Sequence, residues 1–150
     1  MEHITSKNNR WIRLAIRLKQ KKYRDKNKMF LMEGLRNAED VQNQEISDIV
    51  CLVQSGRAEN GSVQHIFERG ENLHWLFCEV EESLMRLISG TENGQGIILL
   101  VKQPYVMDYP QLLNGLHGKY VLLDTVRDPG NVGAIIRTAA AAGCSGVFLT

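Results

Sequence analysis

Cysteine and histidine are scarce in this sequence, and neither is clustered. The three cysteines, Cys51, Cys78 and Cys144, lie far apart without Cys-x-x-Cys spacing, and the four histidines are equally scattered. Zinc and redox sites need such residues at short, regular spacings, so no metal site is expected. Because the cysteines occur in apolar runs such as "IVCLV" and "WLFC", we expect reduced, mostly buried thiols of a cytoplasmic protein.

Long apolar runs are missing as well. No stretch approaches the roughly 18 consecutive apolar residues of a membrane-spanning helix, and the N-terminus is too polar for a signal peptide. No segment repeats another. The sequence therefore predicts a soluble, cytoplasmic protein with no membrane partner. Its 150 residues, 43% of them apolar, suffice for one ordinary domain or two small ones with a buried core.

Acidic residues are nearly absent from the start of the chain. Met1–Lys28 contains ten of the 18 Lys and Arg but only two of the 17 Asp and Glu. This segment therefore carries about +8 and the remainder about −7, although the formal net charge of the whole chain is +1. Such an asymmetry indicates a polyanionic partner, and an ordinary solvated surface helix is the alternative that charge alone leaves open.

The basic segment contains a helical pattern, "RWIRLAIRLKQKKY", which Thr5 or Ser6 is expected to cap. At about 100° per residue, one apolar face is formed by Trp11, Leu14, Ala15 and Leu18. An adjacent cationic stripe is formed by Arg10, Arg13, Arg17 and Lys21. The polar "KKYRDKNK" of Lys21–Lys28 is predicted to be an exposed loop.

Strand and helix patterns alternate over residues 29–101, which predicts a compact α/β domain. Strands are expected in "MFLMEG", "DIVCLV", "HWLFCEV" and "GIILLV", and helices in "LRNAEDVQNQ", "SVQHIFERG" and "EESLMRLIS". Residues 102–118 combine prolines and glycines and are interpreted as a linker, with a short helical turn at "PQLLNGL". In residues 119–150, the strand "KYVLLDTV", the helix "VGAIIRTAAAAG" and the strand "GVFLT" form one βαβ unit with parallel strands.

The turn between that strand and helix is Asp128–Asn131. Proline presets φ, glycine supplies a positive φ, and the asparagine is expected to cap the helix. Arg137 follows on an otherwise apolar and small-residue helix, one turn after Gly133, so its guanidinium can extend over that glycine toward the turn. A lone arginine at the edge of an apolar helix is the alternative. A nucleotide-phosphate site is disfavoured, because "DPGNVGAI" has neither the dinucleotide nor the P-loop spacing.

These residues carry a resemblance. The run "LLDTVRDPGNVGAIIRTAAAAGCSGVFL" closely resembles the first motif of the SpoU (TrmH) family of RNA 2′-O-ribose methyltransferases, in the SPOUT superfamily. The matching positions are Asp124, Asp128, Pro129, Asn131, Gly133, Arg137, Thr138 and Ala139. Upstream, "FLMEGLRNAEDV" and "GTENGQGIILLV" resemble the start and the end of that family's substrate-binding domain. The resemblance covers roughly residues 5–150.

The resemblance implies an α/β fold class in two parts: a small ribosomal-protein-like RNA-binding domain, then the first βαβ part of an α/β knot methyltransferase domain. The expected organisation has a basic N-terminal helix or arm at 1–28 and the RNA substrate-binding domain at 29–101. The linker at 102–118 then leads into an incomplete SPOUT domain at 119–150.

By the same resemblance, S-adenosylmethionine donates a methyl group to a ribose 2′-hydroxyl of rRNA or tRNA. Arg137 and Asn131 match the family's catalytic positions. Because arginine keeps its proton, stabilising an alkoxide and clamping a phosphate is the expected role. The expected RNA-binding residues are Arg10, Arg13, Arg17, Lys21, Lys22 and Arg24. Trp11 or Tyr23 is a candidate for base stacking, with a core position favoured for Trp11. Glu33 is expected to cap a helix rather than orient RNA.

The family's second and third motifs, which form the knot that binds the methyl donor and most of the dimer interface, are not in these 150 residues. No cofactor-binding residue is therefore assigned. We expect a C-terminally truncated chain that binds no S-adenosylmethionine by itself and is inactive alone, while the complete enzyme is a homodimer. The alternative is a non-catalytic RNA-binding module in which residues 1–101 do the work.

Overall fold

A five-stranded mixed sheet organises the first of two units, Met1–Pro104 and Tyr105–Thr150, into which the chain divides in this computed structural model. The structure describes residues 1–90, 95–104 and 117–150. The strands are β1 (Glu2–Ile4), β2 (Met29–Glu33), β3 (Val50–Gln54), β4 (Leu76–Val80) and β5 (Ile97–Lys102). Their order is β1-β4-β3-β5-β2; β1, β4 and β3 are parallel, and β5 is antiparallel to both of its neighbours. The four strands expected between residues 29 and 101 are all present.

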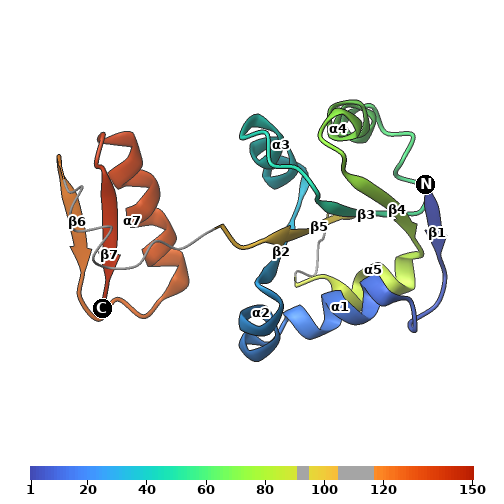
Figure 1. Ribbon diagram of the computed structural model, residues 1–150, viewed down its shortest axis with the longest axis horizontal. Helices are drawn as coiled ribbons and strands as arrows, with labels where there is room; N and C mark the ends of the chain where they lie inside the picture. The colour runs from blue at the N-terminus through green and yellow to red at the C-terminus, as the bar shows by residue number, and fades with distance from the viewer. Residues whose placement is uncertain (91–94, 105–116) are drawn as a thin grey trace. The chain divides into compact units, whose positions relative to one another are not determined.

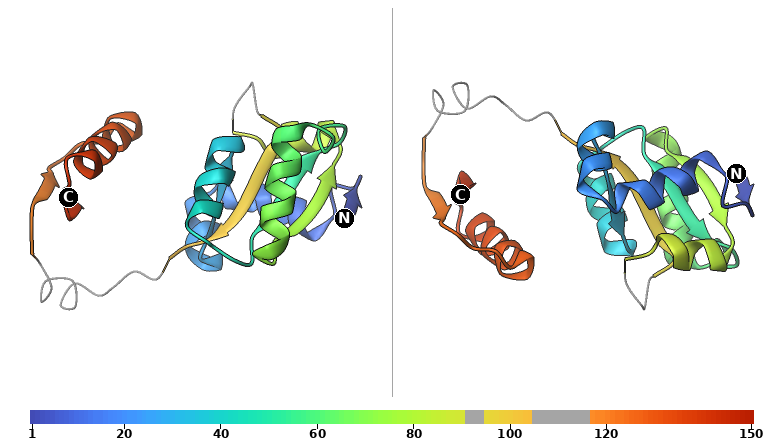
Figure 2. Two further views of the ribbon diagram at one scale, coloured as in Figure 1. Left: turned by 90° about the horizontal axis from the view of Figure 1, so that it is seen from above. Right: turned by 90° about the horizontal axis from the view of Figure 1, so that it is seen from below.

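Helices cover both faces of this sheet, as Figures 1 and 2 show. On one face lie α3 (Leu35–Asn43) and α4 (Gly61–Asn72), and on the other lie α1 (Arg10–Leu18) and α5 (Glu82–Ile88). A strand buried on both sides alternates between two cores rather than between core and water. Leu52 thus pairs with Cys78 and Ile98 in one cluster, while its neighbours Cys51 and Val53 belong to the other. This is why the central strands are continuous apolar runs.

The first helix begins three or four residues later than expected. Asn9 is its N-cap, with Oδ1 accepting a hydrogen bond from Trp11 N at 2.8 Å, so the prediction of Thr5 or Ser6 was wrong. The buried side chains are Ile12, Ala15 and Leu18, whereas Trp11 and Leu14 are only partly buried beside the same cluster. The buried face of α1 is therefore centred on Ile12, Ala15 and Leu18, and is turned slightly from the face that the spacing predicted.

Two elements were not expected. The segment predicted as an exposed loop contains a helix, α2 (Lys21–Asn27), which ends where Lys28 adopts a left-handed φ of 51°. It has no buried residue, so it carries no apolar periodicity to predict it, although lysine and arginine favour helices. The short strand β1 is held by pairing with β4, its Ile4 opposite Val80. Such a pairing between distant segments leaves no local signal.

The turn after β2 depends on a glycine. Gly34 has a φ of +106° and caps α3 without a side chain, so Gln95 Oε1 accepts the hydrogen bond from Leu35 N at 2.8 Å instead. A Cβ on Gly34 would lie 2.9 Å from that Oε1. Glu33 does not cap the helix, contrary to expectation: its Oε1 accepts from Ser89 Oγ at 2.6 Å and its Oε2 from Gly90 N at 3.0 Å. Glu33 therefore ties β2 to the end of α5.

The described part of the second unit, residues 117–150, contains β6 (Tyr120–Leu123), α7 (Pro129–Ala141) and β7 (Gly146–Leu149). The two strands are parallel and lie side by side with α7 against them (Figure 1), which confirms the predicted βαβ unit. Among the residues described in this unit, only Leu123 and Ala139 are buried apolar side chains. The helical turn predicted at "PQLLNGL" lies outside the described residues.

All three cysteines are free thiols. Cys51 and Cys78 are buried in the first unit and Cys144 is half-buried in the second, in agreement with the prediction of reduced, mostly buried thiols. Burial raises the pKa of Cys51, and burial together with the nearby Glu2 raises the pKa of Cys78 to about 11. Within the described ranges, no helix combines the length and apolar character needed to cross a membrane.

Candidate functional site

The candidate catalytic residues lie at the start and middle of α7. Asp128, not Asn131, is the N-cap: its Oδ1 accepts a hydrogen bond from Asn131 N at 2.8 Å. Pro129 then takes the first helical position, where its missing N–H costs nothing. Asn131 is the third residue of the helix and exposed. The prediction that Asn131 caps the helix was wrong, and the correction leaves its side-chain amide available for other contacts.

Arg137 projects from the middle of the helix into solvent. A Cβ built on Gly133 would lie 3.6 Å from Arg137 Nη1, which is ordinary van der Waals contact. The guanidinium therefore lies over Gly133, one turn toward the N-terminus, in the direction that helical side chains prefer. This is the direction expected from the sequence, and it brings the cation back toward the end of α7 where Asp128 and Asn131 lie.

Neither side chain is engaged by another part of the described chain. The Asn131 amide and the Arg137 guanidinium make no hydrogen bond or ion pair within residues 1–90, 95–104 and 117–150. The amides at the start of α7 add a partial positive charge. A planar cation with several donors and a side-chain amide form a suitable environment for an anionic oxygen, while the Asp128 carboxylate already accepts a hydrogen bond at the N-terminus of the helix.

An open apolar groove of about 330 Å³ is formed by one face of α7, by β6 and by the segment that follows the helix. Its lining residues are Val121, Ala134, Ile135, Thr138, Ala139, Ala142 and Cys144. The only polar side-chain groups among them are the Thr138 hydroxyl and the Cys144 thiol, and Thr138 Oγ1 already donates to Ala134 O at 3.0 Å. The groove can accept apolar surface, and its lining has no charged side chain to pair with a charged group.

The basic residues predicted to bind RNA are displayed by α1 and α2. Arg10, Arg13 and Arg17 are exposed on α1, and Lys21 and Lys22 are exposed on the first turn of α2. Two of these cations lie over aromatic rings: the Arg10 guanidinium is 4.4 Å from the Trp11 ring centroid, and that of Arg17 is 5.7 Å from the Tyr23 ring centroid. Trp11 also packs against the core, in agreement with the core position that was favoured for it over base stacking.

Two cations of the same segment hold the fold together. Arg24 Nη1 donates to Leu18 O at 3.0 Å and to Lys19 O at 2.8 Å, which satisfies the last carbonyls of α1. Lys19 Nζ donates to Leu87 O at 2.8 Å and to Ser89 O at 2.9 Å, at the end of α5. Arg24 was predicted to bind RNA, and the contacts of Lys19 were not predicted. The carbonyls that Lys19 contacts lie 68 and 70 residues away, so no local signal in the sequence indicates them.

The basic charge of this surface is not neutralised within the described chain. The close contacts between basic and acidic side chains there join His3 to Glu79, His65 to Glu68 and Arg86 to Glu82, so no lysine or arginine of the first 28 residues is paired with a carboxylate. A solvated helix of an ordinary domain usually intersperses both signs. The unpaired cations on α1 and α2, named here the basic face (Arg10, Arg13, Arg17, Lys21 and Lys22), therefore favour a polyanionic ligand over the alternative of a solvated helix.

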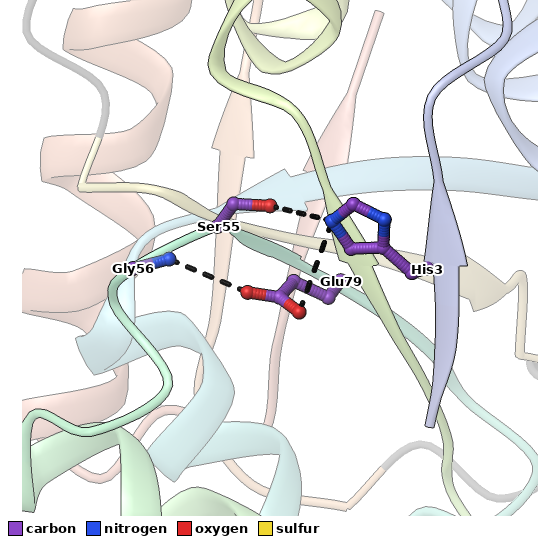
Figure 3. Close-up of polar contacts among 4 residues, drawn as sticks. All are labelled: His3, Ser55, Gly56 and Glu79. Atoms are coloured by element: carbon purple, nitrogen blue, oxygen red, sulfur yellow. Dashed lines mark hydrogen bonds and ion pairs between the residues drawn. The ribbon is translucent and has the colours of Figure 1, made fainter.

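A polar cluster that sequence reasoning missed lies where the parallel strands of the first unit end (Figure 3). His3 Nε2 lies 3.2 Å from Ser55 Oγ and 4.0 Å from Glu79 Oε2, and Glu79 Oε1 accepts from Gly56 N at 3.3 Å. Ser55 and Glu79 both contact Nε2 of His3. In a Ser-His-acid catalytic triad the serine and the acid contact different ring nitrogens, so this cluster is not such a triad. The cluster instead fastens β1 to the loop after β3.

Comparison with known proteins relates both units to one class of enzyme. Residues 9–99 match the MRM3-like substrate binding domain, and residues 118–150 match the SpoU rRNA Methylase family. The chain is 30% identical over 150 residues to the 23S rRNA (guanosine(2553)-2′-O)-methyltransferase RlmP of Bacillus subtilis, covering 99% of this chain and 54% of that protein. It is 63% identical over 65 residues to the mitochondrial rRNA methyltransferase 3B of Danio rerio, covering 41% of this chain and 15% of the relative.

Solved structures agree. An rRNA methyltransferase from Sinorhizobium meliloti aligns with a TM-score of 0.77 at 32% identity, over 99% of this chain and 54% of that one. Its AdoMet-bound form aligns with a TM-score of 0.76. The fold is thus that of the SPOUT class of RNA methyltransferases. The chain belongs to the SpoU (TrmH) family of RNA 2′-O-methyltransferases, and it spans about half the length of the Bacillus and Sinorhizobium relatives.

Proposed function

We propose that this chain is part of an S-adenosylmethionine-dependent rRNA 2′-O-ribose methyltransferase, in which the basic face binds RNA and α7 supplies Arg137 and Asn131 to the ribose. The observation that carries the proposal is the exposed Arg137 guanidinium, which lies over Gly133 within the family motif and has no partner among the described residues. The choice of rRNA rests on the names of the relatives, since these residues do not themselves distinguish rRNA from tRNA.

In this proposal the protein prepares the ribose oxygen. A guanidinium with a pKa above about 12 keeps its proton, so Arg137 acts by charge and hydrogen bonding rather than as a base. It stabilises the negative charge that develops as the 2′-hydroxyl becomes an alkoxide, and its second edge can clamp a neighbouring phosphate. The Asn131 amide orients the same oxygen, because it lies on the first turn of α7 with no competing partner among the described residues.

When bound, S-adenosylmethionine supplies the methyl group. The groove beside α7 does not fit that molecule, because its Thr138 and Cys144 side chains offer no partner for an ammonium and a carboxylate. We therefore propose that the polypeptide of residues 1–150 alone binds no donor and transfers no methyl group. Isothermal titration of S-adenosylmethionine into this polypeptide should give no heat of binding, whereas the full gene product should bind it. Micromolar binding by the 150-residue polypeptide would contradict the proposal.

The catalytic role is tested by methyl transfer from tritiated donor to rRNA with the full gene product. Arg137→Ala should lower kcat by about 100- to 1000-fold, the effect of removing one preorganised oxyanion donor. Arg36→Ala is the matched control, because Arg36 is also an exposed helical arginine but lies on α3 of the other unit. Full activity of Arg137→Ala would remove this residue from the mechanism. RNA binding without transfer by the wild-type product would favour the non-catalytic RNA-binding module.

The RNA-binding role is tested by the salt dependence of affinity. Arg13→Ala with Lys22→Ala should weaken RNA binding and reduce the slope of log K against log salt by about 1 to 2, because each phosphate contact releases counterions. The control pair Arg36→Ala with Arg69→Ala removes the same charge from α3 and α4, which cover the opposite face of the sheet. Equal changes in slope for the two pairs would show that the basic face is not the RNA-binding surface.

Several finer predictions from the sequence are kept as parts of this proposal. They are the ribosomal-protein-like character of the first domain, the boundaries at residues 29–101 and 119–150, the cytoplasmic location and the homodimer. The Danio relative is named as mitochondrial, so location needs its own experiment. Dimerisation is favoured by the exposure of Leu122 (65%), Leu149 (56%) and Ile136 (41%). Sedimentation of the full gene product tests it, and a monomer at all concentrations would contradict it.

A further inference from the structure

The loop that leads from β6 into α7 is held at its first residues by a threonine outside the matched motif positions. Because β6 and β7 are parallel, with Leu123 opposite Leu149, their carboxyl ends lie at the same edge of the sheet. Asp124 follows β6 and Thr150 follows β7. Thr150 N donates to Leu123 O at 3.0 Å, which continues the pairing of the two strands by one residue.

The Thr150 hydroxyl then connects three groups of the neighbouring chain segment. Its Oγ1 donates to Asp124 Oδ1 at 2.8 Å and accepts from Thr125 N at 3.4 Å, and it lies 3.4 Å from Leu123 O. A hydroxyl offers one donor and two acceptor positions. The short contact to the Asp124 carboxylate takes the proton, and the amide of Thr125 approaches a lone pair. One side chain thereby fixes both residues that start the loop.

The residue held in this way has an unusual backbone. Thr125 has a φ of +54°, in the left-handed region, which is a genuine outlier for a β-branched residue. Such a conformation is strained and persists only where its surroundings determine it. The loop it begins ends at Asp128, the N-cap of α7. The conformation of Thr125 therefore sets where α7 starts relative to the edge of the sheet.

We propose that Thr150 is a positioning residue of the methyltransferase: through Asp124 and Thr125 it holds the Asp124–Asp128 loop in its strained form and so places Asn131 and Arg137. This inference rests on the proposed function, because its main consequence is a rate of methyl transfer. A misplacement of catalytic groups by about 1 Å can cost up to about 100-fold in rate. Loss of the hydroxyl should thus affect kcat rather than the binding of RNA by the other unit.

The experiment compares Thr150→Val, which keeps the shape but loses the hydroxyl, with Thr150→Ser, which keeps the hydroxyl. In the full gene product, Thr150→Val should lower kcat at least 10-fold and leave KM for rRNA within about 2-fold, and Thr150→Ser should stay within about 2-fold of wild type. Asp124→Ala should resemble Thr150→Val. Wild-type kcat in Thr150→Val, or an equal loss in Thr150→Ser, would overturn the inference.

A second readout separates this inference from the proposed function. The backbone carbon shifts of Thr125, measured by NMR, report whether its φ is positive. In wild type they should show the left-handed conformation, and in Thr150→Val they should move toward ordinary values while Thr150→Ser matches wild type. If the wild-type product transfers no methyl group, the proposed function fails and the shifts alone decide the positioning role. Unchanged Thr125 shifts in Thr150→Val would overturn it.

Discussion

The two units differ in how completely their strands are covered. In the first, helices lie on both faces of the sheet, and Leu52, Leu99 and Ile98 are at most 1% exposed. In the described part of the second, one helix lies against two strands, and Leu122 on β6 is 65% exposed. The same pattern of β-branched and apolar residues therefore forms a closed core in one unit and an open apolar surface in the other.

Because of this difference, the candidate functional groups of the two units depend on the surrounding structure in different ways. The side chains of the first unit that face solvent, on the basic face, are free to bind a polyanion because the core beneath them does not depend on them. In the second unit the candidate catalytic groups lie on a helix with a single buried residue, Ala139. Their placement depends on caps and loop contacts, such as Asp128 to Asn131 N, rather than on deep packing. Mutations should therefore affect the two units in different ways.

The largest difference between the units should appear in thiol reactivity. Cys51 and Cys78 are fully buried, and burial raises the pKa of each thiol, that of Cys78 to about 11. Cys144 is half-buried at the edge of the open groove. A chromogenic disulfide reagent at pH 8 should label Cys144 rapidly and the other two on the order of 1000-fold more slowly, because their reaction waits for opening of a core stable by about 5 kcal/mol. Cys144→Ser should remove the fast phase, and three fast thiols would contradict the comparison.

The next largest difference concerns truncation of leucines. Leu52→Ala should destabilise the first unit by about 2–5 kcal/mol, since it leaves a cavity between two strands and a helix. Leu122→Ala, at an exposed site of the second unit, should change stability by less than about 0.5 kcal/mol. Both tryptophans, Trp11 and Trp75, belong to the first unit, so their fluorescence in urea reports its unfolding while circular dichroism follows the whole chain. Similar losses for the two variants would mean that the second unit has a core of its own.

Patterns that depend on burial were read correctly from the sequence. The strands β2 to β5 and the helices α3 to α5 were predicted because each carries apolar residues at a helical or strand spacing. α2 was missed because a helix without a buried residue has no apolar period, and β1 because its three residues gain their structure from β4. Local periodicity thus predicts elements that cover a core and misses those held by polar or distant contacts.

The candidate site was predictable to the level of residue identity but not of geometry. The motif named Asn131 and Arg137, and the spacing from Gly133 predicted the direction of the guanidinium. The cap was assigned to Asn131 instead of Asp128, because both residue types cap helices well and sequence alone does not fix which one starts the helix. The contacts of Thr150 could not be predicted from the sequence. Its partners Asp124 and Thr125 are distant in sequence and come near Thr150 only because β6 pairs with β7.

One substitution should have opposite signs in the two units. Gly34→Ala should destabilise the first unit by about 1–3 kcal/mol, because φ there is +106° and the new Cβ would meet Gln95 at 2.9 Å. Gly133→Ala should stabilise α7 by about 0.5–1 kcal/mol, because it lies within a helix and its Cβ would make only an ordinary contact with Arg137. Urea unfolding followed by circular dichroism measures both changes. Destabilisation by Gly133→Ala would indicate that the contact with Arg137 is tighter than 3.6 Å.

The smallest expected effect concerns the polar cluster of His3, Ser55 and Glu79 in the first unit, which lies at the edge of the five-stranded sheet. His3 and Glu79 are partly exposed and 4.0 Å apart (Figure 3), so their ion pair should be worth at most about 1 kcal/mol. His3→Ala should leave the unfolding midpoint nearly unchanged but speed hydrogen exchange of the β1 amides. β1 is a three-residue edge strand that would then be held by its pairing with β4, the buried Ile4 and the hydrogen bond from Asn9 Nδ2 to Glu2 Oε1. Glu79→Gln should be milder than Glu79→Ala, since the amide oxygen can still accept from Gly56 N. If His3→Ala instead lowered the stability of the whole unit as much as Leu52→Ala, the cluster would be part of the core's support rather than a local fastening of its edge.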